Sequence, residues 1–266
     1  MIPALLLLAS LAAAAPAPAS DASSIHLTPA QAHAIGLKIW QNEAGGKVQF
    51  LTDWNVGEAF GSFGIGHFIW YPAGKPGPFI ESFPGVVDAL AAAGETIPAW
   101  MQGHPPCPWA DRDAFYADFD GPRLTELRAL LARTVDVQAL YAAHRLETAL
   151  PKMLEAAEPS ERATLEKRFD AVAAAPNGVY ALVDYVNFKG EGTSPTERYA
   201  GQGWGLLQAL ELSEDAAPGQ PSVEAFAKGA DAALTRRVAN APPERREREQ
   251  GWLPGWRARL KTYLEP

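Results

Sequence analysis

Glu43 is the acidic side chain whose position in the sequence most clearly suggests chemistry. It follows Ile35 and Ile39 at intervals of four residues, so the three side chains share one face of a predicted helix. A carboxylate on an apolar helix face is costly unless it is neutral or paired, and the negative end of the helix dipole raises a carboxyl pKa further. Both effects favour the protonated form near neutral pH, which is the form that a general acid for a glycosidic leaving group requires.

A glycine-rich stretch with further polar side chains begins just after this helix. Residues 47–78 contain glycines at 57, 61, 64, 66, 74 and 77 and short β-prone pieces, and this composition favours a small hairpin lobe. The polar candidates in the stretch are Asp53, Asn55, Glu58, Ser62 and His67. A buried acid that faces such a hairpin predicts a cleft in which a glycosidic bond is cleaved.

Several of these groups also have a plain structural interpretation. Lys47 lies four residues after Glu43 and could hold its carboxylate in an ion pair. Asp53 and Glu58 could be solvated loop carboxylates. The tryptophans, Trp54 among them, could stack on sugar rings or fill the core.

The order of these residues resembles that of the lysozyme superfamily, and the phage-type lysozymes most closely. In those enzymes a catalytic Glu ends a helix, and the hairpin that follows carries an Asp and then a Thr-x-Gly-x-Gly-His string. The string from Ser62 to His67 matches this pattern, with Ser in place of Thr. Residues 181–192 are also similar to a later helix of the family, which ends beside the cleft. The resemblance covers roughly residues 28–72 and 178–210.

This resemblance implies that Glu43 is the general acid and that Ser62 holds a water or the reacting sugar. The second carboxylate stays open between Asp53, nine residues before Ser62, and Glu58, four residues before it, because the family's spacing lies between the two. Goose-type lysozymes and lytic transglycosylases work with one Glu and no obligate second carboxylate. In the transglycosylase mechanism the bond to N-acetylmuramic acid is broken by internal attack instead of by water, so hydrolase and transglycosylase both stay open.

The candidate substrate-binding residues are Trp54, Asn55, His67, Tyr185 and Asn187. Aromatic faces pack on pyranose rings, and amide groups exchange hydrogen bonds with sugar hydroxyls. His67 closes the glycine motif and is the most structural member of the set. Asn55 could instead form an Asx turn beside Trp54.

The helices that must position these residues are marked by their caps. A capping box at 28–31 opens the helix that runs to Glu43, and Gly45 and Gly46 end it. Further helices are predicted after Asp120, from Thr134 with Pro151 near its end, after Ser160, over 180–188, after a second capping box at 194–197, and over 222–238. The charged run 242–250 is interpreted as a solvated helix face.

Together these elements predict an α+β fold that is mainly helical, with the two lobes of a lysozyme-like protein. We expect a single domain over residues 20–266. Its hairpin lobe covers about 47–78 and its helical body about 110–266. The segment 80–175 has no counterpart in the family that the rest of the chain resembles.

Composition excludes several classes of protein. The chain has 266 residues, enough to bury a sizeable core, and its formal net charge of -8 argues against a nucleic-acid-binding surface. Cys107 is the single cysteine, so no internal disulfide can form. The five histidines are scattered without metal-ligand spacing, so neither a metal nor an organic cofactor is expected. Nothing in the sequence indicates the oligomeric state.

The first 19 residues predict a signal peptide. The apolar run at 5–12 is too short to span a bilayer, and Ala17-Pro18-Ala19 offers a cleavage site. No other stretch approaches the roughly 18 apolar residues of a transmembrane helix. We therefore expect a periplasmic or secreted protein with no membrane span.

Two functions follow as expectations. The first is an exported glycan-cleaving enzyme that acts on the glycan strands of peptidoglycan, with Glu43 as general acid; another polysaccharide, such as chitin, is a further candidate substrate. The second is a catalytically inactive lysozyme-like protein with a binding or scaffold role in the periplasm. A second carboxylate across an open cleft from Glu43 favours the enzyme. Pairing of Glu43 with Lys47 or an Arg, with the cleft filled by Trp54 or Trp70, favours the scaffold.

Overall fold

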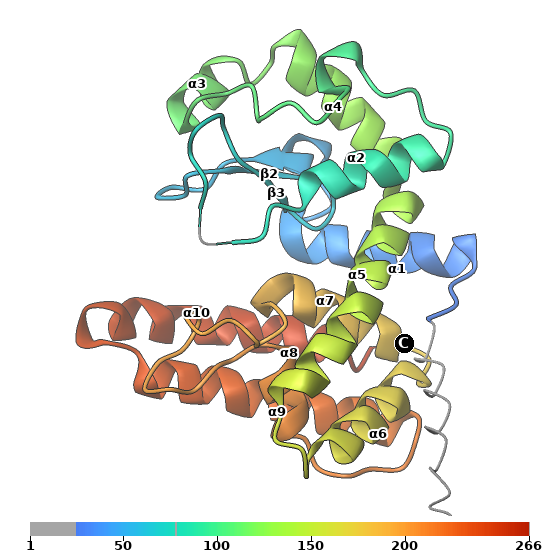
Figure 1. Cartoon of the computed structure of the whole chain (residues 1–266), viewed down its shortest axis with the longest axis vertical. Helices are drawn as coiled ribbons and strands as arrows, with labels where there is room; N and C mark the ends of the chain where they lie inside the picture. The colour runs from blue at the N-terminus through green and yellow to red at the C-terminus, as the bar shows by residue number, and fades with distance from the viewer. Residues whose placement is uncertain (1–24, 78, 266) are drawn as a thin grey trace, which may run out of the picture.

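The described part of the chain is mainly helical and carries one small antiparallel sheet, as predicted for an α+β fold (Figure 1). The structure is a computed structural model of the whole chain, and it describes residues 25–77 and 79–265. The signal peptide expected over residues 1–19 lies outside the described residues.

Along the described chain, helix α1 precedes the sheet and the other α-helices follow it. The α-helices of the described residues are α1 (Pro29–Ala44), α2 (Phe83–Ala92), α3 (Arg112–Ala117), α4 (Pro122–Arg133), α5 (Val135–Ala156), α6 (Arg162–Ala173), α7 (Gly178–Lys189), α8 (Leu206–Glu211), α9 (Gln220–Asn240) and α10 (Pro243–Thr262). Two short 3-10 helices are η1 (Val48–Leu51) and η2 (Ala99–Met101). Within the described ranges, none of these helices combines the length and the apolar character needed to cross a membrane.

The sheet is a meander of three short strands, β1 (Thr52–Asp53), β2 (Gly61–Phe63) and β3 (Phe68–Trp70). The antiparallel register places Asp53 opposite Ser62, and Ser62 opposite Ile69. Residues 54–60 loop out between β1 and β2. Two residues that are nine positions apart in the sequence therefore become direct cross-strand partners.

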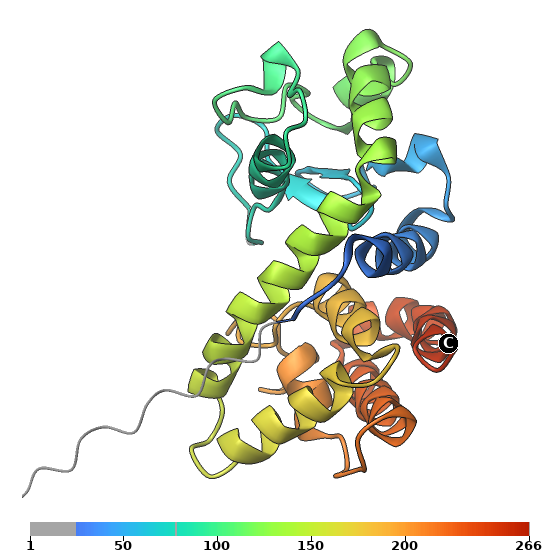
Figure 2. The same cartoon turned by 90° about the vertical axis from the view of Figure 1, so that its right-hand side faces the viewer.

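Helix α5 joins the two groups of elements in the described chain. Figure 2 shows it running from the group that holds the sheet, α2, α3 and α4 to the group that holds α6 to α10. It packs against α1, α2, α6 and α7. Gly36 of α1 allows a close approach, because a Cβ there would lie 2.6 Å from the Val135 side chain and 3.3 Å from Ala139. This contact fixes α1 against the long helix.

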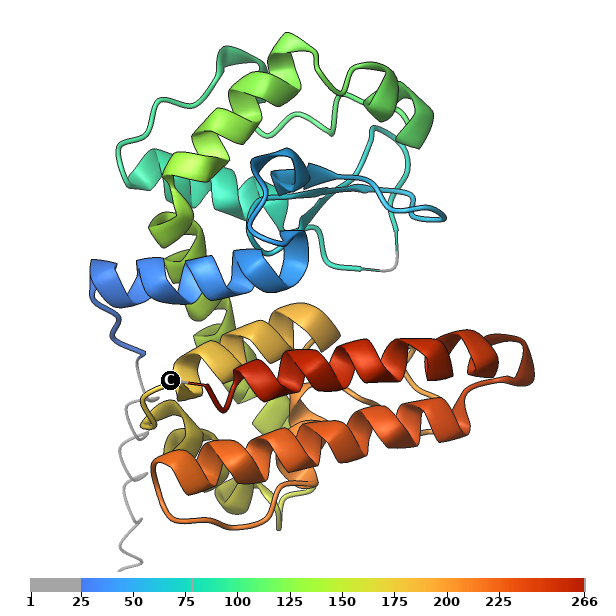
Figure 3. The ribbon, with the colours of Figure 1, turned by 180° about the vertical axis from the view of Figure 1, so that it is seen from behind.

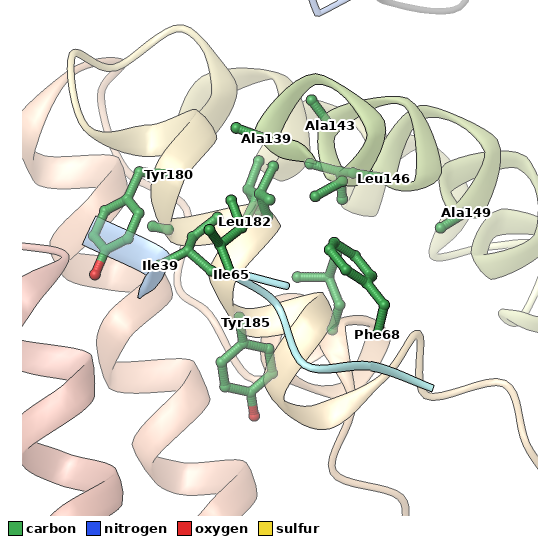
Figure 4. Close-up of a cluster of buried hydrophobic side chains, with 14 of the residues drawn as sticks. Ile39, Ile65, Phe68, Ala139, Ala143, Leu146, Ala149, Tyr180, Leu182 and Tyr185 are labelled. Carbon is green, nitrogen blue, oxygen red and sulfur yellow. The ribbon is translucent and has the colours of Figure 1, made fainter. Parts of the chain in front are cut away.

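The core beneath the candidate site joins α1, the hairpin and α7. Ile39, Ile65, Phe68, Leu182 and Tyr185 are each at most 1% exposed. Figure 4 shows these side chains gathered beside the small residues of α5. The apolar segment 180–188 is a buried helix, as predicted, because Tyr180 to Tyr185 are buried on every face of α7.

The caps of α1 are confirmed in detail. The Thr28 hydroxyl accepts the backbone N–H of Gln31, and the Gln31 side chain accepts the N–H of Thr28 in return. Gly45 adopts a φ of 59°, the left-handed conformation that closes a helix at low cost for glycine. The helix therefore ends one turn after Ile39, where Glu43 lies.

The second capping box is a wrong prediction. Residues 194–197 form no helix, and α8 begins only at Leu206. The Ser194 hydroxyl accepts the N–H of Thr196, two residues on, so it is used in a local turn and caps nothing.

The prediction for Pro151 is confirmed, because Pro151 lies within α5 and the helix ends five residues later, at Ala156. The run 242–250 does form part of α10, but Glu249 is fully buried and is paired with Arg237 and Arg245. Glu249 therefore belongs to a buried group of ion pairs, whereas the prediction placed it on a solvated helix face.

Two glycines offer a matched test of this packing. Gly178→Ala should lower the free energy of unfolding by about 1–3 kcal/mol, because the new Cβ would lie 1.6 Å from the Val172 carbonyl oxygen. Gly251→Ala should raise it by about 0.5–1 kcal/mol, because this exposed position inside α10 has open space and alanine favours helix. Urea denaturation of both variants checks the two signs, and equal effects would contradict the α6–α7 contact.

Candidate functional site

Glu43 occupies the last turn of α1, and its side chain is 16% exposed. Its Oε1 accepts hydrogen bonds from Arg259 Nη2 at 2.6 Å and from Asn187 Nδ2 at 3.3 Å. Its Oε2 lies 3.8 Å from His67 Nδ1. The ends of α1 and α7, helix α10 and the hairpin therefore converge on one carboxylate.

Arg259 connects this carboxylate to a second one. Its Nε donates to Asp184 Oδ2 at 2.7 Å and its Nη2 to Asp184 Oδ1 at 2.8 Å, in addition to the bond from Nη2 to Glu43. Asp184 is fully buried, and it also accepts from the Tyr263 hydroxyl at 2.7 Å and from Asn42 Nδ2 at 3.2 Å. Both carboxylate oxygens of Asp184 thus accept hydrogen bonds, as a buried ion pair requires.

The spacing along each helix places these groups on facing surfaces. Asp184 and Asn187 are three residues apart on α7. Arg259 of α10 and Tyr263, which caps the end of that helix in a helical conformation, are four residues apart, so each pair shares a face. Figure 3 shows α10 lying alongside α7 beneath α1. Glu43 is contacted from both helices, by Arg259 of α10 and by Asn187 in the last turn of α7.

The glycines of the hexapeptide 62–67 allow the hairpin to approach α5 and α7. A Cβ at Gly64, whose φ is 78°, would lie 2.4 Å from Gln138 Oε1, which accepts the N–H of Ile65. A Cβ at Gly66 would lie 3.0 Å from Asn187 Oδ1, and Asn187 Nδ2 donates to the Gly66 carbonyl at 2.9 Å. The motif therefore sets the distance between the hairpin and the end of α7.

His67 ends the hexapeptide in a strained conformation, with a φ of 49°. Its Nε2 donates to the Phe50 carbonyl at 3.0 Å, and this bond turns Nδ1 toward Glu43. The structural role expected for His67 is consistent with this geometry. The imidazole also supplies part of the electrostatic surroundings of Glu43.

The prediction of a raised pKa for Glu43 is wrong. Burial does raise the pKa, but Arg259 and His67, together with hydrogen bonds from Arg259 and Asn187, outweigh it, so the pKa lies below its ordinary value. The helix that carries Glu43 does raise the pKa by burial, but the cation from α10 reverses the direction. Glu43 is ionised near neutral pH in the free protein.

Glu58, on the loop of the hairpin, has a pKa above its ordinary value. Burial is the main cause, a hydrogen bond from Asn55 Nδ2 at 3.1 Å and the charge of His67 oppose it, and the charge of Asp53 adds to it. His67 therefore acts on both Glu43 and Glu58. The site holds two carboxyls whose pKa values are moved in opposite directions, a pattern that is common where acid and base roles are divided.

Asp53 and Ser62 are brought together by the sheet. Asp53 accepts a hydrogen bond from the Tyr116 hydroxyl at 2.5 Å. As cross-strand partners, Asp53 and Ser62 point to the same face of the sheet, with Cβ atoms typically about 5 Å apart. The nine-residue spacing between them is therefore not an obstacle to a shared role, because the loop 54–60 absorbs the extra residues.

Two of the aromatic candidates belong to the core, which corrects their assignment as substrate-binding residues. Trp54 is 1% exposed, packs on Phe115 and donates from Nε1 to the Glu58 carbonyl. Tyr185 is fully buried, and its hydroxyl donates to the Trp204 carbonyl at 2.9 Å. Neither ring presents a face to a sugar.

Asn187 and Asn55 keep their place beside the candidate carboxyls. Asn187 donates to Glu43 and to the Gly66 carbonyl, as described above, so it positions the carboxylate and the hairpin together. Asn55 donates to Glu58 from three residues away and is exposed. Its side chain therefore supports the hairpin loop that carries Glu58.

The residues that control the site were not among the predicted ones. Asp184 lies in α7, Arg259 in α10, and Tyr263 directly after α10, and none of their sequence motifs points to Glu43. The available signal was the spacing of polar and aromatic residues along one face of α10, from Trp252 and Trp256 to Arg259 and Tyr263. A buried acid on α1 needs a cation, and this face supplies one.

A surface hollow of about 630 Å³ lies beside the hairpin lobe, and its lining includes none of the Glu43 contacts. It is lined by residues of the segments 71–84 and 104–106, among them Tyr71, Glu81 and His104. Within the described ranges, no three His, Cys, Asp or Glu side chains lie close enough together to hold a metal ion.

Comparison with known proteins gives no relative. No family model matches the chain, and no curated protein and no solved structure is significantly similar to it. The candidate site is therefore judged on the geometry and electrostatics of its own residues.

Arg259→Gln tests the electrostatic control of Glu43. Without the guanidinium, burial becomes the dominant influence, so the pKa of Glu43 should rise above its ordinary value. A carboxyl ¹³C titration by NMR measures this shift. Arg257→Gln is the matched control, because Arg257 lies on the same helix and pairs with the exposed Asp231; an unchanged Glu43 titration in Arg259→Gln would contradict the assignment.

Proposed function

We propose that this chain is an exported glycan-cleaving enzyme with a lysozyme-like fold, that it acts on the glycan strands of peptidoglycan, and that Glu43 is its general acid. The convergence on Glu43 of the end of α1, the hexapeptide 62–67 and the end of α7 is the observation that carries this proposal. It brings together the segments on which the resemblance to the lysozyme superfamily rests. The localisation in the periplasm or outside the cell belongs to the same proposal.

The ionised state of Glu43 has to be reconciled with an acid role. Arg259 makes two hydrogen bonds to Asp184 and one to Glu43. Arg259 can therefore release Glu43, because Asp184 still compensates the positive charge of the guanidinium. A sugar that enters beside Glu43 and separates it from Arg259 leaves burial as the dominant influence, so the carboxyl takes up the proton that it then donates to the glycosidic oxygen.

A second group is available on the hairpin. Asp53 lies opposite Ser62 and suits stabilisation of an oxocarbenium-like state or activation of a water placed by the Ser62 hydroxyl. Glu58, with its raised pKa, is the other candidate. Hydrolysis and internal attack both begin with protonation of the leaving oxygen, so the products distinguish them.

A binding or scaffold role is the second candidate, and one specific observation favours it. Glu43 is paired with an arginine at 2.6 Å, which is one of the two features expected of an inactive protein. The other expected feature has no support, because Trp54 and Trp70 pack against Phe115 and Phe83 in the core. The pairing of Glu43 with Arg259 therefore keeps the scaffold as the second candidate, which the digestion below separates from the enzyme.

Digestion of purified sacculi tests the proposal. The mature protein should release soluble muropeptides, and Glu43→Gln should reduce the rate by at least about 100-fold, the usual contribution of a general acid. Glu224→Gln, at an exposed position of α9, is the matched control and should be fully active. Mass analysis of 1,6-anhydro or reducing ends would identify a transglycosylase or a hydrolase. Binding to sacculi without release by the unmodified protein would contradict the enzyme and support the scaffold.

The pH dependence provides a separate test of the acid. The active form needs a protonated Glu43, so activity should rise as the pH falls. The pH profile of kcat/KM reports the free protein, so the transition due to Glu43 should lie below the ordinary carboxyl pKa. The pH profile of kcat reports the complex, and its transition should lie at higher pH if substrate separates Glu43 from Arg259. In Arg259→Gln the two transitions should occur at the same pH. A kcat/KM that increases from pH 5 to pH 8 would exclude Glu43 as the acid.

A further inference from the structure

Lys189, the last residue of α7, lies beside the candidate site without a counter-ion. It follows Asn187 by two residues and is half-buried. Its Nζ lies 3.8 Å from the ring centroids of both Phe188 and Trp256. No described side chain or carbonyl accepts a hydrogen bond from this ammonium, and no carboxylate among the described residues lies within ion-pair distance of it.

The carboxylates near Lys189 are committed to other cations. Glu249 accepts from Arg237 at 2.8 and 3.2 Å, and Glu43 is held by Arg259. The two arginines themselves act on Lys189, so burial, Arg237 and Arg259 together lower its pKa well below the ordinary value. An ammonium in such surroundings is stabilised when an anion arrives from outside.

Glu197 is the remaining acidic group that acts on this region. It faces Gly190, and within the described residues no hydrogen bond or ion pair holds it. Burial raises its pKa, whereas the charges of Arg237 and Lys189 lower it. Glu197 therefore influences Lys189 electrostatically without forming an ion pair with it.

Aromatic rings extend outward from the ammonium along α10. Trp256 is followed by Trp252 at 5.9 Å between ring centroids, and Trp252 is 41% exposed. These rings and Phe188 give the ammonium an apolar, sugar-compatible border on the side that leads to solvent. Such a border suits a ligand that combines a pyranose or peptide with a negative charge.

We propose that Lys189 binds a carboxylate of the peptide attached to a muramyl residue of the substrate, and thereby selects acidic glycan strands over neutral ones. This inference rests on the proposed function, because it takes peptidoglycan as the substrate. A neutral polymer such as chitin offers Lys189 no carboxylate. Lys189 is thus a specificity residue beside the candidate acid Glu43.

The test compares N-acetylmuramyl-L-alanine with its carboxamide, which differ in one charge. In an NMR titration the unmodified protein should bind the carboxylate at least about tenfold more tightly, the usual scale for a hydrogen bond between charged groups. Lys189→Met keeps an unbranched side chain of similar length, removes the ammonium and should bind the two ligands equally. Lys189→Arg keeps the positive charge and should retain most of the preference.

Lys228→Met is the matched control, because Lys228 is an exposed lysine of α9, and it should leave the preference unchanged. Equal binding of both ligands by the unmodified protein, or a preference that survives in a folded Lys189→Met, would overturn the inference. The sacculus digestion separates the two proposals. A carboxylate preference without cleavage rejects the enzyme and keeps the binding site, whereas cleavage without a preference rejects the role of Lys189 alone.

Discussion

The guanidinium of Arg259 is the interaction on which the arrangement of this protein depends. It neutralises Asp184, which is fully buried, and it reaches Glu43 at the end of another helix. A buried carboxylate without its cation costs several kcal/mol, about 3–5 when one partner of a pair is removed. Helices α1, α7 and α10 are therefore held together by one shared charge, with Tyr263 and Asn42 completing the hydrogen bonds of Asp184.

The same charge determines the chemical state of the site. A carboxylate that is held ionised by its surroundings is stable and unreactive as an acid, so stability and the proposed activity make opposite demands on Glu43. The hydrogen bonds from Arg259 to Asp184 offer a way to satisfy both, because Asp184 can retain the cation when Glu43 is engaged elsewhere. The proposed activity depends on a change of hydrogen-bond partner at Glu43, from Arg259 to the substrate, and needs no large movement of helices.

Much of the fold could be predicted from local sequence, and much of the site could not. The capping box at Thr28 and the left-handed Gly45 are local signals, and each was confirmed because no distant residue is needed to produce it. The lowered pKa of Glu43 depends on α10, whose residues lie far along the chain. The burial of Trp54 and Tyr185 depends on which helices cover them, and a sequence pattern does not distinguish an aromatic residue in the core from one at a surface.

The contact between Glu43 and Arg259 joins residues that are 216 positions apart. Closing a segment of this length costs conformational entropy, which the packing of α10 must offset. A chain in which α10 is not docked would leave the carboxylate of Glu43 without its cation. The ionisation of Glu43 therefore reports whether α10 is in position.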